Sequence, residues 1–218
     1  MQSWRSLKME INQVYCMDAL KFLKQLPDKY ADLILTDPPY GIKADKMTNF
    51  DGYGLAKTKK YEDKWDIKTP EKEVFNEILR VSKKAIIFGA QFYTDKLPVN
   101  GHWIVWDKKG NIKFKNVQGD CELAWTNINR KSIKKYTIIQ QGFIAEEKAR
   151  LHPTQKPVSL FESIIKDYTE PGQLILDCYI GSGTTAVAAK RSGRNFIGCD
   201  ILQKYVDITN RRLENPWL

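Results

Sequence analysis

Residues 174–201 read LILDCYIGSGTTAVAAKRSGRNFIGCDI, and this stretch decides the fold class. Its pattern predicts a strand that ends at Asp177, a glycine-rich turn that begins at Gly181, a helix, and a second strand that ends at Asp200. Gly181 precedes Asp200 by about 20 residues, the spacing of nucleotide-binding βαβ units, in which the acid accepts hydrogen bonds from ribose hydroxyls. Ala186 stands where a dinucleotide fingerprint has its third glycine, which disfavours a nicotinamide cofactor. The stretch therefore predicts a nucleotide-like ligand, and the alternative is a tight turn without a ligand.

Apolar runs and helical periodicity alternate along the rest of the chain. Strands are expected at residues 11–16, 32–36, 85–89, 103–107, 121–126, 174–178 and 195–199. Helices are expected near residues 18–26, 71–82, 91–97, 157–168, 183–192 and 202–214. Most strands are followed by a helix, so we expect one α/β domain over residues 1–218, with helices on both faces of a mostly parallel, seven-stranded sheet. No helix separates 103–107 from 121–126, and this pair therefore predicts an antiparallel hairpin.

A second motif, Asp37-Pro38-Pro39-Tyr40, directly follows the predicted strand at 32–36. The prolines fix φ and make a rigid turn, which holds the Asp37 carboxylate and the Pro38 carbonyl as two acceptors beside the flat face of Tyr40. Two such acceptors would grip both hydrogens of an amino group on an aromatic ring and free its lone pair for attack. The alternative is a proline turn capped by an aspartate.

The two motifs together resemble the β class of DNA amino-methyltransferases. That resemblance covers nearly the whole chain, through YCMDALKFLKQLPDKYADLILTDPPYGI (15–42), KWD (64–66), EILRVSKKAIIFGAQFY (77–93), HWIVWDKK (102–109) and HPTQKPVSLFESIIKDYTEPGQLILDCYIGSGTT (152–185). It implies a Rossmann-like methyltransferase fold with circularly permuted motif order, the catalytic motif preceding the cofactor motif. The strands before Asp37 and Asp177 should then be neighbours at the switch point of the sheet, where open α/β sheets bind ligands.

The resemblance also implies roles for single residues. Asp37, Pro38, Pro39 and Tyr40 match the catalytic tetrapeptide, with Tyr40 stacking on a base flipped out of the duplex. Matches to the S-adenosylmethionine site are Asp18, Asp37, His152, Thr154, Gln155, Lys156, Asp177, Tyr179, Gly181, Ser182, Gly183, Thr184, Thr185 and Asp200. Within that set Asp200 would bind the ribose, Asp18 would lie near the adenine, and the stretch from His152 would flank the methionine end. A loop contact is the alternative for His152. Tyr179 stands where the family often has Phe, which keeps a ring near the cofactor.

The implied activity is transfer of a methyl group from S-adenosylmethionine to N6 of adenine in double-stranded DNA. N4-cytosine methylation stays open, since DPPY favours adenine and SPPY favours cytosine within one architecture. An NPPY motif serves protein-glutamine methylation, but the basic charge favours nucleic acid. A non-catalytic cofactor- or DNA-binding module is the alternative of another class. No metal is expected, and none of the four cysteines follows a proline as cytosine-C5 methylation would require.

The formal net charge is +9, which would attract a polyanion, although a solubilising surface would carry charge too. The basic segments 41–70 and 127–151 are the candidate DNA-recognition loops. Both are short, so specificity would be weak or would need a homodimer partner. The start, MQSWRSLKMEI, lacks the apolar core of a signal peptide, and no apolar run is long enough to cross a bilayer. We therefore expect a cytoplasmic protein with free thiols and no membrane partner.

Overall fold

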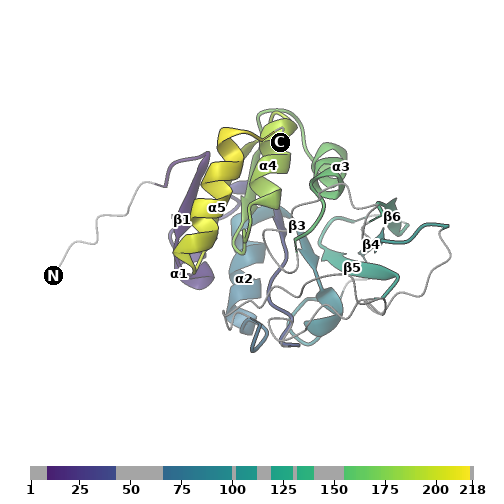
Figure 1. Ribbon diagram of the computed structural model, residues 1–218. Helices are drawn as coiled ribbons and strands as arrows, with labels where there is room; N and C mark the ends of the chain where they lie inside the picture. Colours follow the sequence, from purple (N-terminus) through teal and green to yellow (C-terminus); the bar gives the residue numbers. More distant parts are fainter. Residues whose placement is uncertain are drawn as a thin grey trace.

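The computed structural model describes residues 9–42, 66–99, 102–111, 119–129, 132–139 and 155–216. They form a three-layer α/β/α arrangement in which helices cover both faces of a central sheet (Figure 1). None of the helices in these ranges is both long and apolar enough to span a membrane.

In the part of the chain that the structure describes, the sheet contains eight strands in the order β1-β8-β7-β2-β3-β5-β4-β6. Their bounds are β1 Gln13–Cys16, β2 Ala31–Thr36, β3 Ser82–Phe88, β4 Trp103–Asp107, β5 Cys121–Thr126, β6 Lys134–Thr137, β7 Leu174–Asp177 and β8 Asn195–Asp200. All neighbouring pairs are parallel except β3–β5 and β4–β5, so β5 is the one reversed strand. This arrangement confirms the predicted α/β class and the predicted hairpin.

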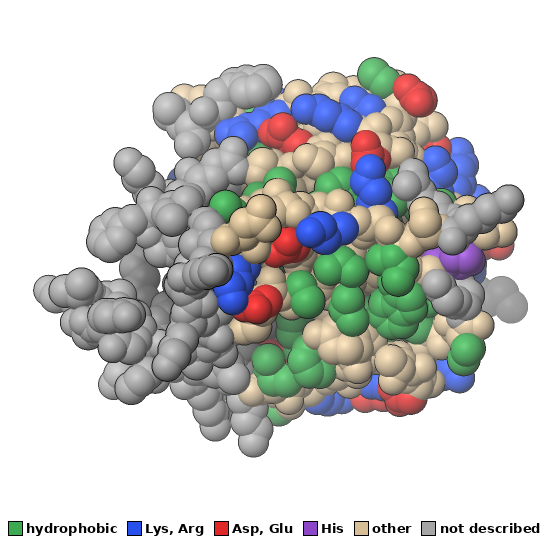
Figure 2. Space-filling view, turned by 90° about the vertical axis from the view of Figure 1, so that its right-hand side faces the viewer, with side chains coloured by type: hydrophobic (Ala, Val, Ile, Leu, Met, Phe, Trp, Pro, Cys, Tyr) green, Lys and Arg blue, Asp and Glu red, His purple; other side chains and the backbone are tan. Residues whose placement is uncertain are grey.

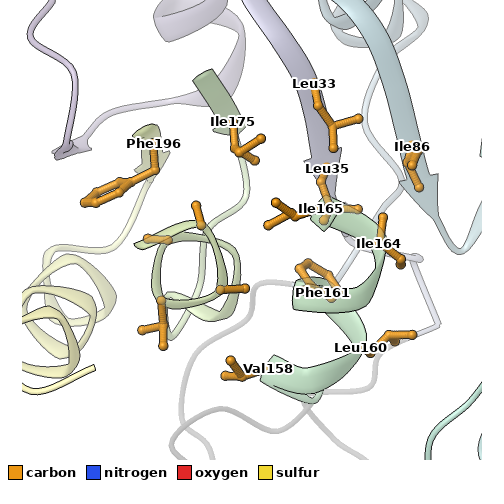
Figure 3. Packing of buried hydrophobic residues seen from close by; sticks show 14 of the residues in the cluster. Leu33, Leu35, Ile86, Val158, Leu160, Phe161, Ile164, Ile165, Ile175 and Phe196 are labelled. Carbon is orange, nitrogen blue, oxygen red and sulfur yellow. The ribbon is translucent and has the colours of Figure 1, made fainter. Parts of the chain in front are cut away.

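The helices are α1 Ala19–Lys24, α2 Lys72–Val81, α3 Val158–Tyr168, α4 Thr184–Arg191 and α5 Gln203–Glu214, with a short 3-10 helix η2 at Ala90–Phe92. Successive residues of a strand point to opposite faces of a sheet. Leu33 and Leu35 accordingly join one apolar core with α3, α4 and α5, whereas Ile34 joins a second core with α1 and α2. Figure 3 shows Phe161 and Ile165 of α3 directed toward Leu35 in the first of these cores.

Two predictions about elements were wrong. The sheet has an eighth strand, β6, where a loop was expected. In β6 only Tyr136 is buried, between the exposed Lys135 and Thr137, so the strand gives almost no apolar signal. The helix expected at 91–97 is only the turn η2 followed by irregular backbone. Tyr93 leaves helical geometry, at φ −130° and ψ 20°, and its buried hydroxyl donates a hydrogen bond to the carbonyl of Pro38.

The arrangement that matters for function is the contact between β2 and β7, whose residues are far apart in sequence. They pair in parallel, with Ile34 opposite Leu176. Asp177, the last residue of β7, and Asp37, the residue after β2, therefore lie at the same carboxyl edge of the sheet. The predicted neighbourhood of the two motif strands is confirmed. β1 pairs with β8 in parallel and α5 packs on both, as expected for a permuted chain order.

Candidate active site

A cavity of about 340 Å³ opens at the carboxyl ends of the parallel strands. Twelve predicted site residues line it: Asp18, Asp37, Pro39, Gln155, Lys156, Asp177, Tyr179, Gly181, Ser182, Thr184, Thr185 and Asp200. Pro38, Tyr40 and Gly183 are neighbours in sequence of lining residues but do not line the cavity themselves, and His152 and Thr154 lie outside the described residues. The structure thus brings most of both motifs to one cavity.

The glycine-rich turn is held from behind by α5 and β8. The amide of Gly181 donates to Oδ2 of Asp200 at 3.1 Å, and the Thr209 hydroxyl donates to the Gly181 carbonyl at 3.0 Å. Gly183 has φ +86°, and a Cβ there would lie 2.5 Å from Cγ2 of Thr209. Glycine is therefore required at 183 by both the backbone and the packing, and the turn leaves its front face to the cavity.

Asp177 ties the two motifs together. Its carboxylate accepts hydrogen bonds from the Thr36 hydroxyl at 2.7 Å, from the Tyr179 amide at 3.0 Å, and from the Thr185 hydroxyl. Thr36 is the residue before Asp37, so this buried carboxylate sets the end of β2 against the glycine-rich turn. Burial raises the pKa of Asp177 to about 6, although the three donors oppose that shift.

Aromatic residues and a glycine position the proline turn. The hydroxyl of Tyr93 donates to the Pro38 carbonyl at 2.7 Å, and that of Tyr40 donates to Oδ1 of Asp37 at 2.5 Å. Tyr40 also stacks on Phe92, with ring centroids 5.0 Å apart. At the end of β3, Gly89 leaves room for this ring, since a Cβ would lie 2.0 Å from Cε1 of Tyr40. One of the two predicted acceptors, the Pro38 carbonyl, is thus already partly engaged.

The segment after the tetrapeptide and the start of α1 are held by two further acids. Asp66 is buried and accepts the amides of Gly41 at 2.7 Å and Ile42 at 3.2 Å. Asp18 caps α1 by accepting the amide of Lys21 at 3.0 Å, and it also lines the cavity.

A chain of alternating charges passes behind the proline turn. The ammonium of Lys156 is hydrogen-bonded to Oδ2 of Asp37 and lies 3.2 Å from Oε2 of Glu122, whose Oε1 accepts from Lys108 at 2.8 Å. Burial alone would lower the pKa of Lys156, but the two carboxylates raise it to about 12. Burial raises the pKa of Asp37 despite the ammonium, whereas Lys156 and Lys108 outweigh burial at Glu122 and lower its pKa.

Sequence reasoning missed Tyr93, Glu122 and Asp66. Asp66 could have been found from the KWD segment that resembles the family. Glu122 could have been found because it is a charged residue within an apolar run that predicts a strand. Tyr93 could not have been found, because nothing in the sequence places its hydroxyl against a proline turn more than fifty positions earlier. Lys156 was predicted at the cofactor, but its ammonium contacts Asp37 and Glu122, and only its carbonyl, which accepts from Thr184 at 3.2 Å, contacts the start of α4.

Comparison with known proteins agrees with this arrangement. A family model described as DNA methylase matches residues 102–211. The Type II methyltransferase M1.MboII of Moraxella bovis is 28% identical over 255 aligned residues, which cover 93% of this chain and 96% of that protein.

Two solved structures share the fold. A crystal structure of an M1.HpyAVI–SAM complex matches with a TM-score of 0.57 and 24% identity over 92% of this chain and 98% of that one. The cytosine-N4-specific PvuII DNA methyltransferase matches with a TM-score of 0.60 and 16% identity, over 91% of this chain and 85% of that one. With its two motifs on one cavity and the family match over half its length, the chain belongs to the DNA methylase family, the N6-adenine/N4-cytosine class of DNA amino-methyltransferases.

Proposed function

We propose that this protein transfers a methyl group from S-adenosylmethionine to N6 of adenine in double-stranded DNA. The observation that carries the proposal is that Asp37, Gly181 and Asp200 line one cavity, with the proline turn and the glycine-rich turn on adjacent strands. The proline turn would hold the amino group that accepts the methyl, and the glycine-rich turn would hold S-adenosylmethionine, the methyl donor.

The cavity fits S-adenosylmethionine. Each oxygen of Asp200 accepts one backbone amide, that of Gly181 or Leu202, and so has acceptor capacity left for ribose hydroxyls. Tyr179, Ile201 and Leu202 supply aromatic and apolar walls of the kind that suits an adenine ring. The solved M1.HpyAVI complex with SAM has the same fold, which supports this assignment.

When bound, the cofactor supplies a methyl group that its sulfonium has already activated, so the chain needs mainly to position the acceptor. We assign Asp37 as the acceptor of an N–H from the target amino group, and the free lone pair of the Pro38 carbonyl as the second acceptor. Tyr40 would stack on the flipped base through the ring face opposite Phe92. Burial raises the pKa of Asp37, which makes this carboxylate a suitable receiver for the proton that the methylated nitrogen must lose.

N4 of cytosine is the second candidate, because the PvuII enzyme shares the fold. Mass spectrometry of nucleosides from unmethylated DNA treated with the protein and S-adenosylmethionine separates the two. N6-methyladenine is expected, and N4-methylcytosine alone would contradict the adenine assignment.

Asp37→Ala should abolish methyl transfer, because it removes the acceptor that positions the amino group, while the affinity for S-adenosylhomocysteine stays near that of the wild type. The removal of one such group is expected to lower kcat by about 100-fold or more. Asp95→Ala, which removes an exposed carboxylate, is the matched control and should keep full activity. Wild-type transfer by the Asp37 variant would remove Asp37 from the reaction.

A further inference from the structure

We propose that Lys156 occupies Asp37 until the target amino group arrives, and that Glu122 then receives the displaced ammonium. Lys156 and Glu122 are thus positioning residues that act on the reaction through Asp37. This inference rests on the proposed function, because it assigns the exchange to the step at which the base enters the cavity.

The geometry places one ammonium between two carboxylates. Lys156 Nζ is hydrogen-bonded to Asp37 and lies 3.2 Å from Oε2 of Glu122, and the lysine side chain is only 6% exposed. Its Nζ also lies 5.6 Å from the ring centroid of Tyr40 and 5.7 Å from that of Phe88. With its side chain buried and both carboxylates within ion-pair distance, the ammonium has little access to water.

The ammonium competes for the atoms that the amino group needs. Oδ1 of Asp37 already accepts the Tyr40 hydroxyl, and Oδ2 accepts Lys156. A neutral amino group is a weaker donor than an ammonium, since hydrogen bonds between charged partners are about twice as strong as neutral ones. Oδ2 has a second lone pair, but an amino group that shares this oxygen with the ammonium is the weaker of its two donors. The base is therefore held more firmly when the ammonium turns to another carboxylate.

Glu122 offers that second place. Its Oε1 accepts from Lys108 at 2.8 Å, whereas Oε2 is buried and accepts no hydrogen bond of ordinary geometry within the part of the chain that the structure describes. A buried carboxylate oxygen without a hydrogen bond is costly and needs an explanation. Oε2 already forms an ion pair with the ammonium at 3.2 Å but does not accept a hydrogen bond from it, so a small movement of Lys156 would complete that bond and supply such an explanation.

The exchange also changes Asp37 in the direction that the reaction requires. Lys156 and Lys108 balance Asp37 and Glu122 in number, so moving the ammonium from one carboxylate to the other leaves the net charge of the buried group unchanged. The movement of the ammonium does free a lone pair on Oδ2 of Asp37, because the hydrogen bond from Lys156 to this oxygen is weakened. Asp37 then becomes a stronger acceptor for the amino N–H and for the proton lost after transfer.

Glu122→Gln tests the inference in the full-length protein, because it keeps the shape of the side chain but removes the charge that receives Lys156. We expect kcat on unmethylated DNA to fall about tenfold or more, the range for loss of one hydrogen bond to a charged group. Affinity for S-adenosylhomocysteine should not change. Glu162→Gln, which breaks an ion pair with Arg191 on α3 and α4 away from the cavity, is the matched control and should keep its kcat.

A double-mutant cycle separates positioning from a merely structural role. If Glu122 acts through the ammonium, Glu122→Gln should have little further effect on kcat in a Lys156→Met background. The same fall in both backgrounds, or a wild-type kcat for Glu122→Gln, would overturn the inference.

A crystal structure of the Asp37→Ala variant gives a readout that does not depend on activity. With its first partner removed, Lys156 should donate to Oε2 of Glu122 a hydrogen bond of ordinary geometry, about 3 Å long, which this oxygen does not accept in the unaltered protein. An ammonium turned away from Glu122 would refute the exchange. If the wild type methylates no DNA, the proposed function fails, whereas this structure still decides where the ammonium goes.

Discussion

Asp177 and Asp200 end adjacent strands, and yet their carboxylates face different partners. Asp177 is buried and accepts hydrogen bonds from the Thr36 hydroxyl, the Tyr179 amide, and the hydroxyl of Thr185 on α4. Within the described ranges, Asp200 accepts two backbone amides, and it lines the cavity with acceptor capacity left. At the scale of single residues, Asp200 is the better candidate for a ligand contact and Asp177 for holding the site together.

Asp200→Ala should weaken binding of S-adenosylhomocysteine by about tenfold or more, because it removes a charged acceptor for the ribose and releases the amide of Gly181. Isothermal titration calorimetry measures the effect. Asp207→Ala, an exposed acid on α5, is the control and should bind as the wild type does. Unchanged affinity in the Asp200 variant would exclude this residue from the site.

Asp177 predicts a pH dependence of stability. Burial raises its pKa to about 6 in the folded protein, above the ordinary value of 3.8. The folded state therefore favours the protonated form, and the stability contributed by Asp177 is present at low pH and is lost as the pH rises through the folded pKa.

Urea unfolding of the wild type and of Asp177→Asn tests this dependence. The free energy of unfolding of the wild type, relative to the variant, should fall by up to about 3 kcal/mol between about pH 4 and about pH 7. Asparagine cannot ionise, so the difference between the two proteins reports the titration of Asp177 alone. It falls with rising pH because the pKa of Asp177 is higher in the folded protein than in the unfolded chain. A difference that is constant with pH would show that the carboxylate titrates normally.

The end of β3 is the element that shapes the base-binding side of the site. Its last residue is followed by Gly89 at φ +69°, then by η2 and Tyr93, so a single turn provides space for the Tyr40 ring and a donor for the Pro38 carbonyl. The tetrapeptide thus depends on an element that the motif itself does not contain.

Gly89→Ala should lower both stability and activity, since the backbone is left-handed and the new Cβ would overlap the Tyr40 ring. Gly193→Ala is a matched control with φ +71° and nothing within 4 Å of the added Cβ. Both variants should lose about 1 kcal/mol or more of unfolding free energy, but only Gly89→Ala should lose methyl transfer. Equal activities in the two variants would show that the Tyr40 contact is unimportant.

Sequence patterns predict well the elements whose own residues form an apolar run or an amphipathic repeat. The strands and helices around the two motifs have apolar runs or amphipathic periodicity, and they lie within a few residues of the expected bounds. β6 was missed because its hydrogen bonds come from β4, about thirty residues earlier, and Tyr136 is its one buried side chain. Tyr93, whose hydroxyl donates to the Pro38 carbonyl, was missed for the same reason, since only the tertiary fold brings it to the proline turn.

At the scale of the whole molecule, the net charge bears on whether DNA can be the methyl acceptor. The chain carries a formal net charge of +9. Figure 2 shows Lys and Arg side chains beside and above a cluster of hydrophobic side chains on one face. Much of the candidate recognition segments 41–70 and 127–151 lies outside the described residues, so their role in DNA recognition stays a prediction.

Binding to DNA should therefore depend steeply on salt. Lysines that neutralise phosphates release counterions, so the association constant should fall about tenfold or more between about 0.05 M and about 0.2 M salt. Fluorescence anisotropy of a labelled duplex measures it, and binding of S-adenosylhomocysteine in the same buffers is the control. An association constant for DNA that does not change with salt would argue against a phosphate-contacting surface.

The placement of β2 between β3 and β7 has a consequence for biosynthesis. A ribosome makes β2 and β3 early but adds β7 only after residue 173. Until then the nascent chain carries the catalytic turn on a strand with one open edge, which is a target for chaperones and for aggregation. Both β7 and the glycine-rich turn must be made before donor and acceptor sites can meet, so a chain terminated before residue 174 would be inert rather than indiscriminately active on the genome.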